Sequence, residues 1–299
     1  MQMPRRRWID TLLAGYFVSI WGSGYVASKV GLQYAAPFTF LSLRYVFGLC
    51  CMIPLVLVLR PRWPASRVEL GHILAAGLLM HAASLGGSHY AQYLGMSAGI
   101  TALILALQPL FTAFIVSRWM HERLSPRQWL GVALGLAGVA LVVWHKIDIR
   151  AASWASLLAV GISLAAITAG TLYQRAFCPA VDLYGASVLQ FAISLAVLAP
   201  LAWAAEGLEV RWTWQLAAAV VYQVILGSIL AVNVLHTLMR HGRATQVTSL
   251  LYLTPIIAVV VELLLFDLVP TQLTLAGIAI TCAGVAMVAW RKTKPAAAY

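Results

Sequence analysis

Long apolar stretches recur along the whole chain and constrain its fold more than any other feature of the sequence. Each stretch is about as long as the roughly 20 residues that a helix needs to cross the hydrocarbon core of a bilayer. The stretches lack the apolar–polar alternation of barrel strands, so we expect helices. The predicted spans cover roughly residues 10–28, 37–59, 70–93, 99–118, 127–144, 154–175, 184–204, 214–239, 246–266 and 271–290.

The composition points to lipid as the solvent of this chain. Hydrophobic residues make up 62% of it and charged residues 10%, whereas about a quarter of the residues of a soluble domain are charged. The first stretch follows three arginines at 5–7, runs past Trp21 and carries Lys29, so it predicts a mature helix rather than a cleaved signal peptide. The predicted fold class is an all-α integral membrane protein with ten transmembrane helices.

The net charge of +11 is explained by membrane topology rather than by a nucleic-acid partner. If the spans alternate in direction, most of the 20 Lys and Arg residues fall in segments on one side of the bilayer. Positive residues favour the cytoplasmic side. We therefore expect a multi-pass protein of the plasma or inner membrane with both termini in the cytoplasm, and with membrane lipid but no nucleic acid among its partners.

The cysteines do not predict a disulfide framework or a metal site. Cys50, Cys51, Cys178 and Cys282 lie within or at the ends of predicted spans, and their spacing does not suit zinc. We expect free thiols that pack as small apolar side chains. A match to the dinucleotide fingerprint at 22–27 lies inside a predicted span without a preceding strand, so it carries no weight. The sequence predicts neither a metal nor a cofactor.

The chain contains an internal repeat. A shift of about 146 residues aligns 103–144 with 249–290 without a gap, and AGVALVVW at 137–144 then meets AGVAMVAW at 283–290. A chance match of small apolar residues is the alternative, but prolines, glycines and tryptophans align together. Five spans per half is an odd number, so the second half must insert in the opposite direction, as in many secondary transporters. The predicted domains are two five-helix repeats, 8–144 and 154–290, followed by a cytoplasmic tail, 291–299.

Glycines on the fifth and tenth spans predict that these two helices pack closely. Gly131, Gly135 and Gly138 lie on one helix and Gly277 and Gly284 on the other, with spacings that allow close backbone approach. The same surface could instead serve dimerisation. The oligomeric state is therefore left open, with a monomer favoured.

These features together resemble the drug/metabolite transporter superfamily in its EamA-type form of two tandem five-helix halves. The residues that carry the resemblance are Trp21-Gly-Ser-Gly-Tyr25, Lys29, Pro37, Arg44, the pairs Gln108-Pro109 and Thr254-Pro255, and Gly131, Gly138, Gly277 and Gly284. Within the superfamily the chain looks most like aromatic amino acid exporters of the YddG type. The family has acidic residues closing the fourth and ninth helices; Glu122 matches the first, but Asp267 is one place out of register. The resemblance implies ten helices around a central cavity and outward transport of amino acids.

Polar residues on single faces of the apolar spans predict a cavity, because a polar group facing lipid is costly. The third span carries one polar stripe at helical spacing, made of His81, Ser84, Ser88 and Gln92. Any one of these groups can instead bond to a neighbouring helix. Further polar candidates on other spans are Gln108, Asn233 and His236. The aromatic candidates for substrate contact are Trp21, Tyr25, Tyr90, Tyr173, Tyr222 and Tyr252.

Pro109 and Pro255 occupy equivalent places in the two halves. A proline inside a helix removes one hydrogen bond and frees a carbonyl that lipid cannot satisfy. We therefore predict paired kinks beside the binding site, with purely structural kinks as the alternative.

Two charged residues within spans are candidates for binding or coupling. Arg44 could pair with a substrate carboxylate or with Glu262, or could extend to the interface without a transport role. Glu262 lies in an apolar run and is a candidate proton carrier, unless it lies near the outer surface.

The function predicted is secondary export of aromatic or other neutral amino acids, or related small metabolites, by alternating access. A carrier of other metabolites or drugs in the same superfamily is the nearest alternative, and a passive channel is another. A membrane enzyme acting on lipid would need a clustered acid/base or metal set, which the sequence does not show. We therefore expect no enzymatic activity and a small organic solute as partner.

Overall fold

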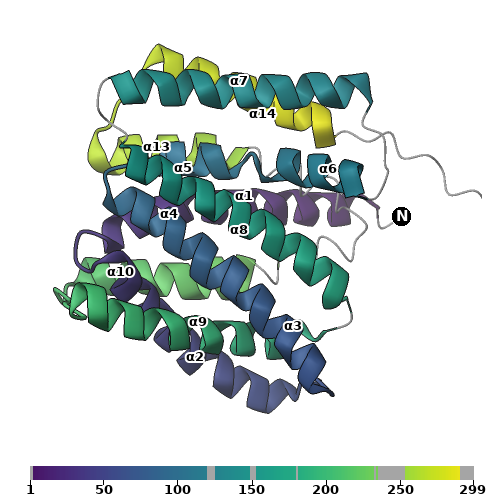
Figure 1. Cartoon of the computed structure of the whole chain (residues 1–299), viewed down its shortest axis with the longest axis vertical. Helices are drawn as coiled ribbons and strands as arrows, with labels where there is room; N and C mark the ends of the chain where they lie inside the picture. Colours follow the sequence, from purple (N-terminus) through teal and green to yellow (C-terminus); the bar gives the residue numbers. More distant parts are fainter. Residues whose placement is uncertain are drawn as a thin grey trace, which may run out of the picture.

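The computed structural model describes residues 3–119, 125–148, 153–179, 181–231, 234 and 253–289 (Figure 1). These residues are helices joined by short loops, and they contain no strand beyond one isolated bridge between Ala35 and Val210. The first half contains α1 (Met3–Gly31), α2 (Pro37–Leu59), α3 (Arg67–Gly77), the π-helix η1 (Leu78–Ala83), α4 (Ser84–Tyr93), α5 (Ala98–Leu105), α6 (Gln108–Trp119) and α7 (Pro126–Asp148). The second contains α8 (Trp154–Phe177), α9 (Leu183–Glu206), α10 (Trp214–Val221), the π-helix η2 (Tyr222–Leu230), α13 (Thr254–Phe266) and α14 (Gln272–Ala289). The all-α prediction is confirmed.

The helices differ in how well they fit a bilayer by length and composition. In the described part of the chain, four are long and apolar enough to cross one: Pro37–Leu59, Arg67–Tyr93, Trp154–Phe177 and Leu183–Glu206. The second of these is α3, η1 and α4 in succession. The other apolar helices have shorter stretches of fully described residues, such as Pro126–Val142 in α7. The predicted spans 214–239 and 246–266 extend into residues outside the described set. The count of ten spans therefore remains a prediction.

Several helices have a small polar residue as their N-cap. A side-chain oxygen there accepts a hydrogen bond from a backbone N–H of the first turn, which otherwise has no partner within the helix. The residues that cap in this way are Ser66, Ser97, Ser153, Asp182 and Thr213. At α2 the first turn instead begins with Pro37, whose missing N–H costs nothing at that position.

Helices α7 and α14 pack face to face at one end of the long axis (Figure 1). A Cβ on Gly138 would lie only 2.6 Å from the Gly277 carbonyl oxygen, and one on Gly284 would lie 2.5 Å from the Gly131 carbonyl oxygen. The predicted close packing of these helices is thus confirmed, within one chain. Because Gly131 lies beside Gly284 while Val142 lies beside Gly277, the two helices run antiparallel.

Helices α2 and α9, the second helices of the two halves, pack at the opposite end (Figure 1). Glu206 at the end of α9 bonds to Thr39 at the start of α2, and Phe191 lies 5.4 Å from Tyr45 between ring centroids. This pair is therefore antiparallel too. Two pairs of equivalent helices thus have the relative direction that an inverted repeat requires.

The two π-helices also lie at equivalent places. The shift of about 146 residues that aligns the halves carries η1 into η2. In η1 the wide turn is visible where the Ser84 N–H bonds to Leu79, five residues back. Segments of π-helix are rare and are often found at functional sites. Nothing in the sequence pattern predicted them.

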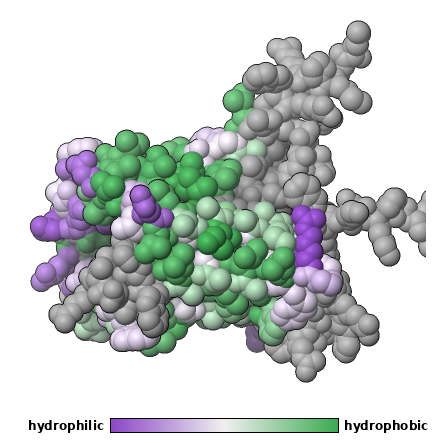
Figure 2. Space-filling view, turned by 90° about the horizontal axis from the view of Figure 1, so that it is seen from above, coloured by the Kyte–Doolittle hydropathy of each residue, from purple (hydrophilic) through white to green (hydrophobic). Residues whose placement is uncertain are grey.

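The surface carries apolar side chains between more polar edges (Figure 2). Leu57, Val58 and Leu264 are among the large aliphatic residues that are mostly exposed. Trp63, Trp154, Trp212 and Trp214 are exposed near helix ends, as the sequence predicted for interfacial anchors. Such a surface suits lipid rather than water.

Candidate functional site

Glu262 is a buried carboxylate on α13 with a complete set of partners. Its Oε1 lies 2.5 Å from the Lys29 ammonium nitrogen and accepts the Ala98 N–H at 3.0 Å. Its Oε2 accepts the Gly99 N–H at 3.1 Å. The negative charge thus lies at the N-terminus of α5, where the helix dipole stabilises it, and joins α1, α5 and α13.

This arrangement corrects one expectation about the two charged residues. Glu262 pairs with Lys29 and not with Arg44. No sequence pattern predicts the pairing, because Lys29 and Glu262 are far apart along the chain and lie at helix positions that the repeat does not relate.

Arg44 and its neighbour Tyr45 connect α2 to the two π-helices. Arg44 Nη2 donates to Ser228 Oγ in η2 at 3.1 Å. The neighbouring Tyr45 is fully buried and donates to the His81 carbonyl oxygen at 3.0 Å. Adjacent residues of α2 therefore contact the π-helices of both halves.

Several buried polar atoms of α2, η1 and α4 have no hydrogen-bond partner within the structure. They are Arg44 Nε, His81 Nδ1, His89 Nε2, and both the oxygen and the nitrogen of the Gln92 amide. Buried polar atoms without partners are rare in proteins and indicate water or a ligand. This group of atoms makes the interior around Arg44 the candidate binding site.

The rest of the predicted stripe on the third span is satisfied by helix packing. Ser84 is buried, and its carbonyl oxygen accepts the Ser163 hydroxyl of α8 at 2.6 Å. The buried Ser88 donates to the Leu85 carbonyl oxygen at 3.1 Å. These serines therefore have the local roles that were the alternative to cavity lining.

The two candidate prolines lie in first turns rather than in the middle of continuous helices. α5 ends at Leu105 and α6 begins at Gln108, so Pro109 occupies the first turn of α6. Pro255 occupies the first turn of α13, where Thr254 precedes it. At Pro109 the predicted kink is thus a full break between two helices. Beside it, Gln108 donates to Thr171 of α8 at 3.1 Å.

The aromatic candidates fall into different environments. Tyr222 OH lies 2.5 Å from Ser23 Oγ, and Tyr173 OH lies 2.7 Å from His72 Nδ1. Tyr25 is partly buried, and Trp21 is exposed beside Phe17. The candidates Asn233, His236 and Tyr252 lie outside the described residues.

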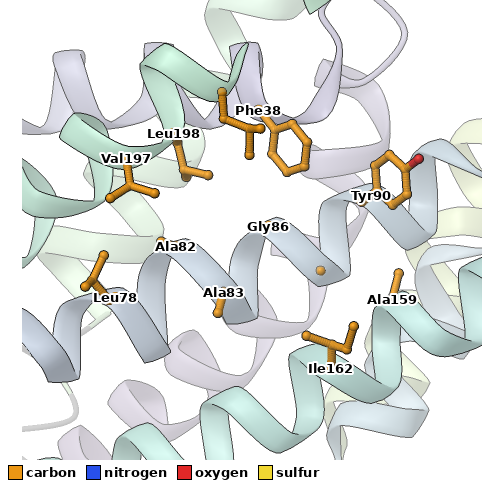
Figure 3. A pocket seen from close by; sticks show the side chains of 12 residues that line it. Phe38, Leu78, Ala82, Ala83, Gly86, Tyr90, Ala159, Ile162, Val197 and Leu198 are labelled. Carbon is orange, nitrogen blue, oxygen red and sulfur yellow. The ribbon is translucent and has the colours of Figure 1, made fainter. Parts of the chain in front are cut away.

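An apolar pocket lies on another face of the helix that carries His81 and His89 (Figure 3). Its volume is about 430 Å³, and α2, η1, α4, α8 and α9 contribute its walls. Phe38 stacks on Tyr90 at one end, with the two rings 5.9 Å apart and nearly parallel. Ile162 and Val197 on its walls are about half exposed. The pocket therefore offers an apolar surface open to one side, and Tyr90 is the one sequence-predicted site residue among those that line it.

Sequence reasoning missed three residues that the geometry brings forward. Lys29 was noted only as part of the first span and of the family resemblance, His89 was not considered, and Ser228 had no distinguishing neighbourhood in the sequence. His89 could have been found from its spacing, since it lies near His81 on the same helix. In the described part of the chain, no three His, Cys, Asp or Glu side chains are grouped to hold a metal.

Comparison with protein families shows which family the chain belongs to. The model of the EamA-like transporter family matches it twice, over residues 8–144 and 153–290. The chain belongs to the EamA-like transporter family. It is therefore a membrane transporter, and the resemblance to the drug/metabolite transporter superfamily is confirmed at that level.

Individual relatives agree with the family. The uncharacterised transporter YvbV of Bacillus subtilis is 26% identical over 289 residues, covering 96% of this chain and 93% of the relative. The uncharacterised inner membrane transporter YedA of Escherichia coli is 26% identical over 240 residues, covering 80% and 77%. A probable amino-acid metabolite efflux pump of Escherichia coli is 31% identical over 139 residues, covering 46% and 44%.

A solved protein structure has a similar fold. It superposes with a TM-score of 0.65 over 94% of this chain and 97% of that chain, at 16% sequence identity. The likeness extends over nearly the whole of both chains, so it concerns the overall arrangement of helices.

Proposed function

We propose that this transporter exports α-amino acids, with aromatic and other neutral ones preferred, by alternating access. The observation that carries the proposal is the group of unpartnered polar atoms around Arg44. They belong to α2, η1 and α4, and Arg44 itself donates to Ser228 of η2. The two π-helices occupy equivalent places in the two halves. Secondary transporters with inverted repeats bind substrate at such an interface, near the middle of the bilayer.

The membrane arrangement proposed with this function is a pair of five-helix units, 8–144 and 154–290, that insert in opposite directions. The antiparallel pairs α7/α14 and α2/α9 support it. The proposal places both termini, including the tail 291–299, in the cytoplasm.

The substrate class draws on two observations. A relative that is 31% identical over 46% of this chain is named a probable amino-acid metabolite efflux pump. The polar interior combines a cation with imidazole and amide groups, which suits a small zwitterion. The aromatic preference rests on the sequence resemblance to exporters of the YddG type and on rings such as Tyr222 beside the interior.

Counterflow in proteoliposomes tests the proposal. Vesicles containing the purified protein are loaded with unlabelled phenylalanine, and the uptake of external labelled phenylalanine is followed, with protein-free vesicles as the control. A transient accumulation of label is expected, and a further panel of tryptophan, tyrosine and threonine ranks the substrates. A carrier shows this trans-stimulation, whereas a channel does not. No accumulation with any of these amino acids contradicts the proposed substrate class.

A further inference from the structure

Arg44 has no carboxylate partner among the side chains that the structure describes. The chain has nine acidic residues, and six of their side chains are described. Four of these bind backbone N–H groups or Lys29: Glu69, Asp182, Glu206 and Glu262. Glu209 and Asp267 are exposed in loops at helix ends. Arg44 thus keeps its charge beside a single described hydroxyl partner, Ser228.

An uncompensated cation in an apolar interior is costly, because low dielectric disfavours the charged form. Such a cation persists where a bound anion supplies the missing charge. Arginine suits a carboxylate in particular, since its planar guanidinium can donate two parallel hydrogen bonds to the two oxygens. The free and buried Nε of Arg44 is one of the donors that this geometry uses.

His89 offers the opposite kind of group. It is 3% exposed, and its Nδ1 lies 2.8 Å from the Leu85 carbonyl oxygen. A carbonyl oxygen only accepts hydrogen bonds, so Nδ1 carries the proton, and in the neutral imidazole Nε2 is then an acceptor. This Nε2 is buried without a partner. It is therefore ready to accept a hydrogen bond from a ligand.

Gln92 adds a second acceptor one helical turn further along α4. The side chain is 7% exposed, and neither its amide oxygen nor its amide nitrogen has a partner in the structure. The ring of His89 packs 5.7 Å from Phe40, which lies one turn before Arg44 on α2. His89 thus packs against α2 one helical turn from Arg44, and Gln92 follows His89 on α4.

We propose that Arg44, His89 and Gln92 form the site for the head group of an α-amino acid. Arg44 binds the carboxylate through its guanidinium, while His89 Nε2 and Gln92 Oε1 accept hydrogen bonds from the ammonium. The inference rests on the proposed function, which it deepens by assigning the atoms that recognise the substrate. It also assigns roles to His89 and Gln92, which lie outside the aromatic groups considered for the substrate side chain.

Ligand-induced thermal stabilisation of the purified full-length protein in detergent tests the site without requiring transport. The probes are phenylalanine, 3-phenylpropionate, which keeps only the carboxylate, and phenethylamine, which keeps only the ammonium. For the wild-type protein we expect the unfolding temperature to rise most with phenylalanine, less with 3-phenylpropionate and not with phenethylamine. Sodium chloride at the same ionic strength is the control for a site that takes any anion.

Three variants separate the contributions. Arg44→Gln is expected to weaken binding of phenylalanine and 3-phenylpropionate by roughly 30-fold or more, as for the loss of one member of a buried charge pair. His89→Leu is expected to abolish the advantage of phenylalanine over 3-phenylpropionate. Arg62→Gln removes an exposed arginine from the loop before α3 and is expected to bind as the wild type does.

The ligand-free protein supplies a second readout. Arg44→Gln is expected to unfold at the same temperature as the wild type or higher, because it removes a buried charge that no described carboxylate neutralises. A large fall, or failure to fold, shows that Arg44 is structural and overturns the proposal. Equal stabilisation by chloride, or ligand binding that survives in Arg44→Gln, overturns it as well. Binding of phenylalanine without counterflow contradicts the proposed export and leaves the head-group site supported.

Discussion

Two buried charges in this transporter differ in how the chain treats them. Glu262 has an ion pair with Lys29 and two backbone N–H donors at the start of α5. Arg44 has one described hydroxyl partner, and its own Nε and polar atoms of η1 and α4 have none. The polar groups around Glu262, here called the closed region, are paired without a ligand. The unpartnered polar groups of Arg44, η1 and α4, here called the open region, are not. The difference separates a charge that stabilises the fold from a charge that is available to a substrate.

The repeat sharpens the same contrast. The shift that aligns the halves places Gln190 at the position equivalent to Arg44. Gln190 is buried, and its amide donates to Gln174 Oε1 at 3.1 Å, so it has a side-chain partner within the protein. The first half thus has a charged residue without a carboxylate partner at this position, and the second half has a neutral residue that is hydrogen-bonded within the protein.

The largest effect on the free energy of unfolding is expected when the closed region loses the charge of Glu262. Glu262→Gln leaves the Lys29 ammonium without its partner in a mostly buried position, so the free energy of unfolding should fall by about 3 kcal/mol. Thermal unfolding of the purified protein measures the loss. The double variant Lys29→Gln/Glu262→Gln removes both charges and should recover part of it. An unchanged unfolding temperature in Glu262→Gln breaks the contrast, because the pair would then not stabilise the fold.

A somewhat smaller effect is expected at the contact between α7 and α14, here called the seam, which is also formed entirely by residues of this chain. Gly138→Leu places a side chain where the Gly277 carbonyl oxygen already lies, so overpacking should lower the free energy of unfolding by about 2 kcal/mol. Gly161→Leu on α8 is the matched control, because no atom outside its own helix lies near a Cβ there. Equal unfolding temperatures for the two variants contradict close packing of the seam.

The smallest effect is expected at the open region. Ser228→Ala removes the one described hydrogen bond of Arg44 to a side chain, which should cost about 1.5 kcal/mol in ligand-free protein. Because a bound carboxylate takes over the Arg44 charge, the cost should shrink when 3-phenylpropionate is present. Unfolding temperatures with and without the ligand measure the difference. If the cost is the same in both, Ser228 and the ligand do not share Arg44, and the contrast is weakened.

The sequence predicted those parts of the fold that depend on local pattern. Apolar runs placed the helices. The glycine spacings within 131–138 and within 277–284 predicted the close packing of α7 and α14. Both signals lie within single helices. Arg44 was also found from its sequence alone, because a charge inside an apolar span is rare and visible.

The partners of these residues could not be predicted, because they depend on three-dimensional contacts between distant helices. Lys29 and Glu262 come from the first helix and from α13, and no spacing relates them. The π-helices likewise have no signal in one sequence, since an extra residue in a turn changes no hydropathy. His89 was missed because a histidine on an apolar helix is most often satisfied by its neighbours, and only the geometry shows that its Nε2 is not.

The central claim is that two equivalent halves insert into the membrane in opposite directions and enclose the Arg44 interior. Trp63 and Glu209 are exposed residues at equivalent positions of the repeat, in loops before α3 and before α10. Each is replaced by cysteine in a chain whose four native cysteines are serine, and intact cells are treated with a membrane-impermeant maleimide. The account predicts that Glu209→Cys reacts in intact cells and that Trp63→Cys reacts only after the membrane is permeabilised. Labelling of both positions from the same side would contradict it.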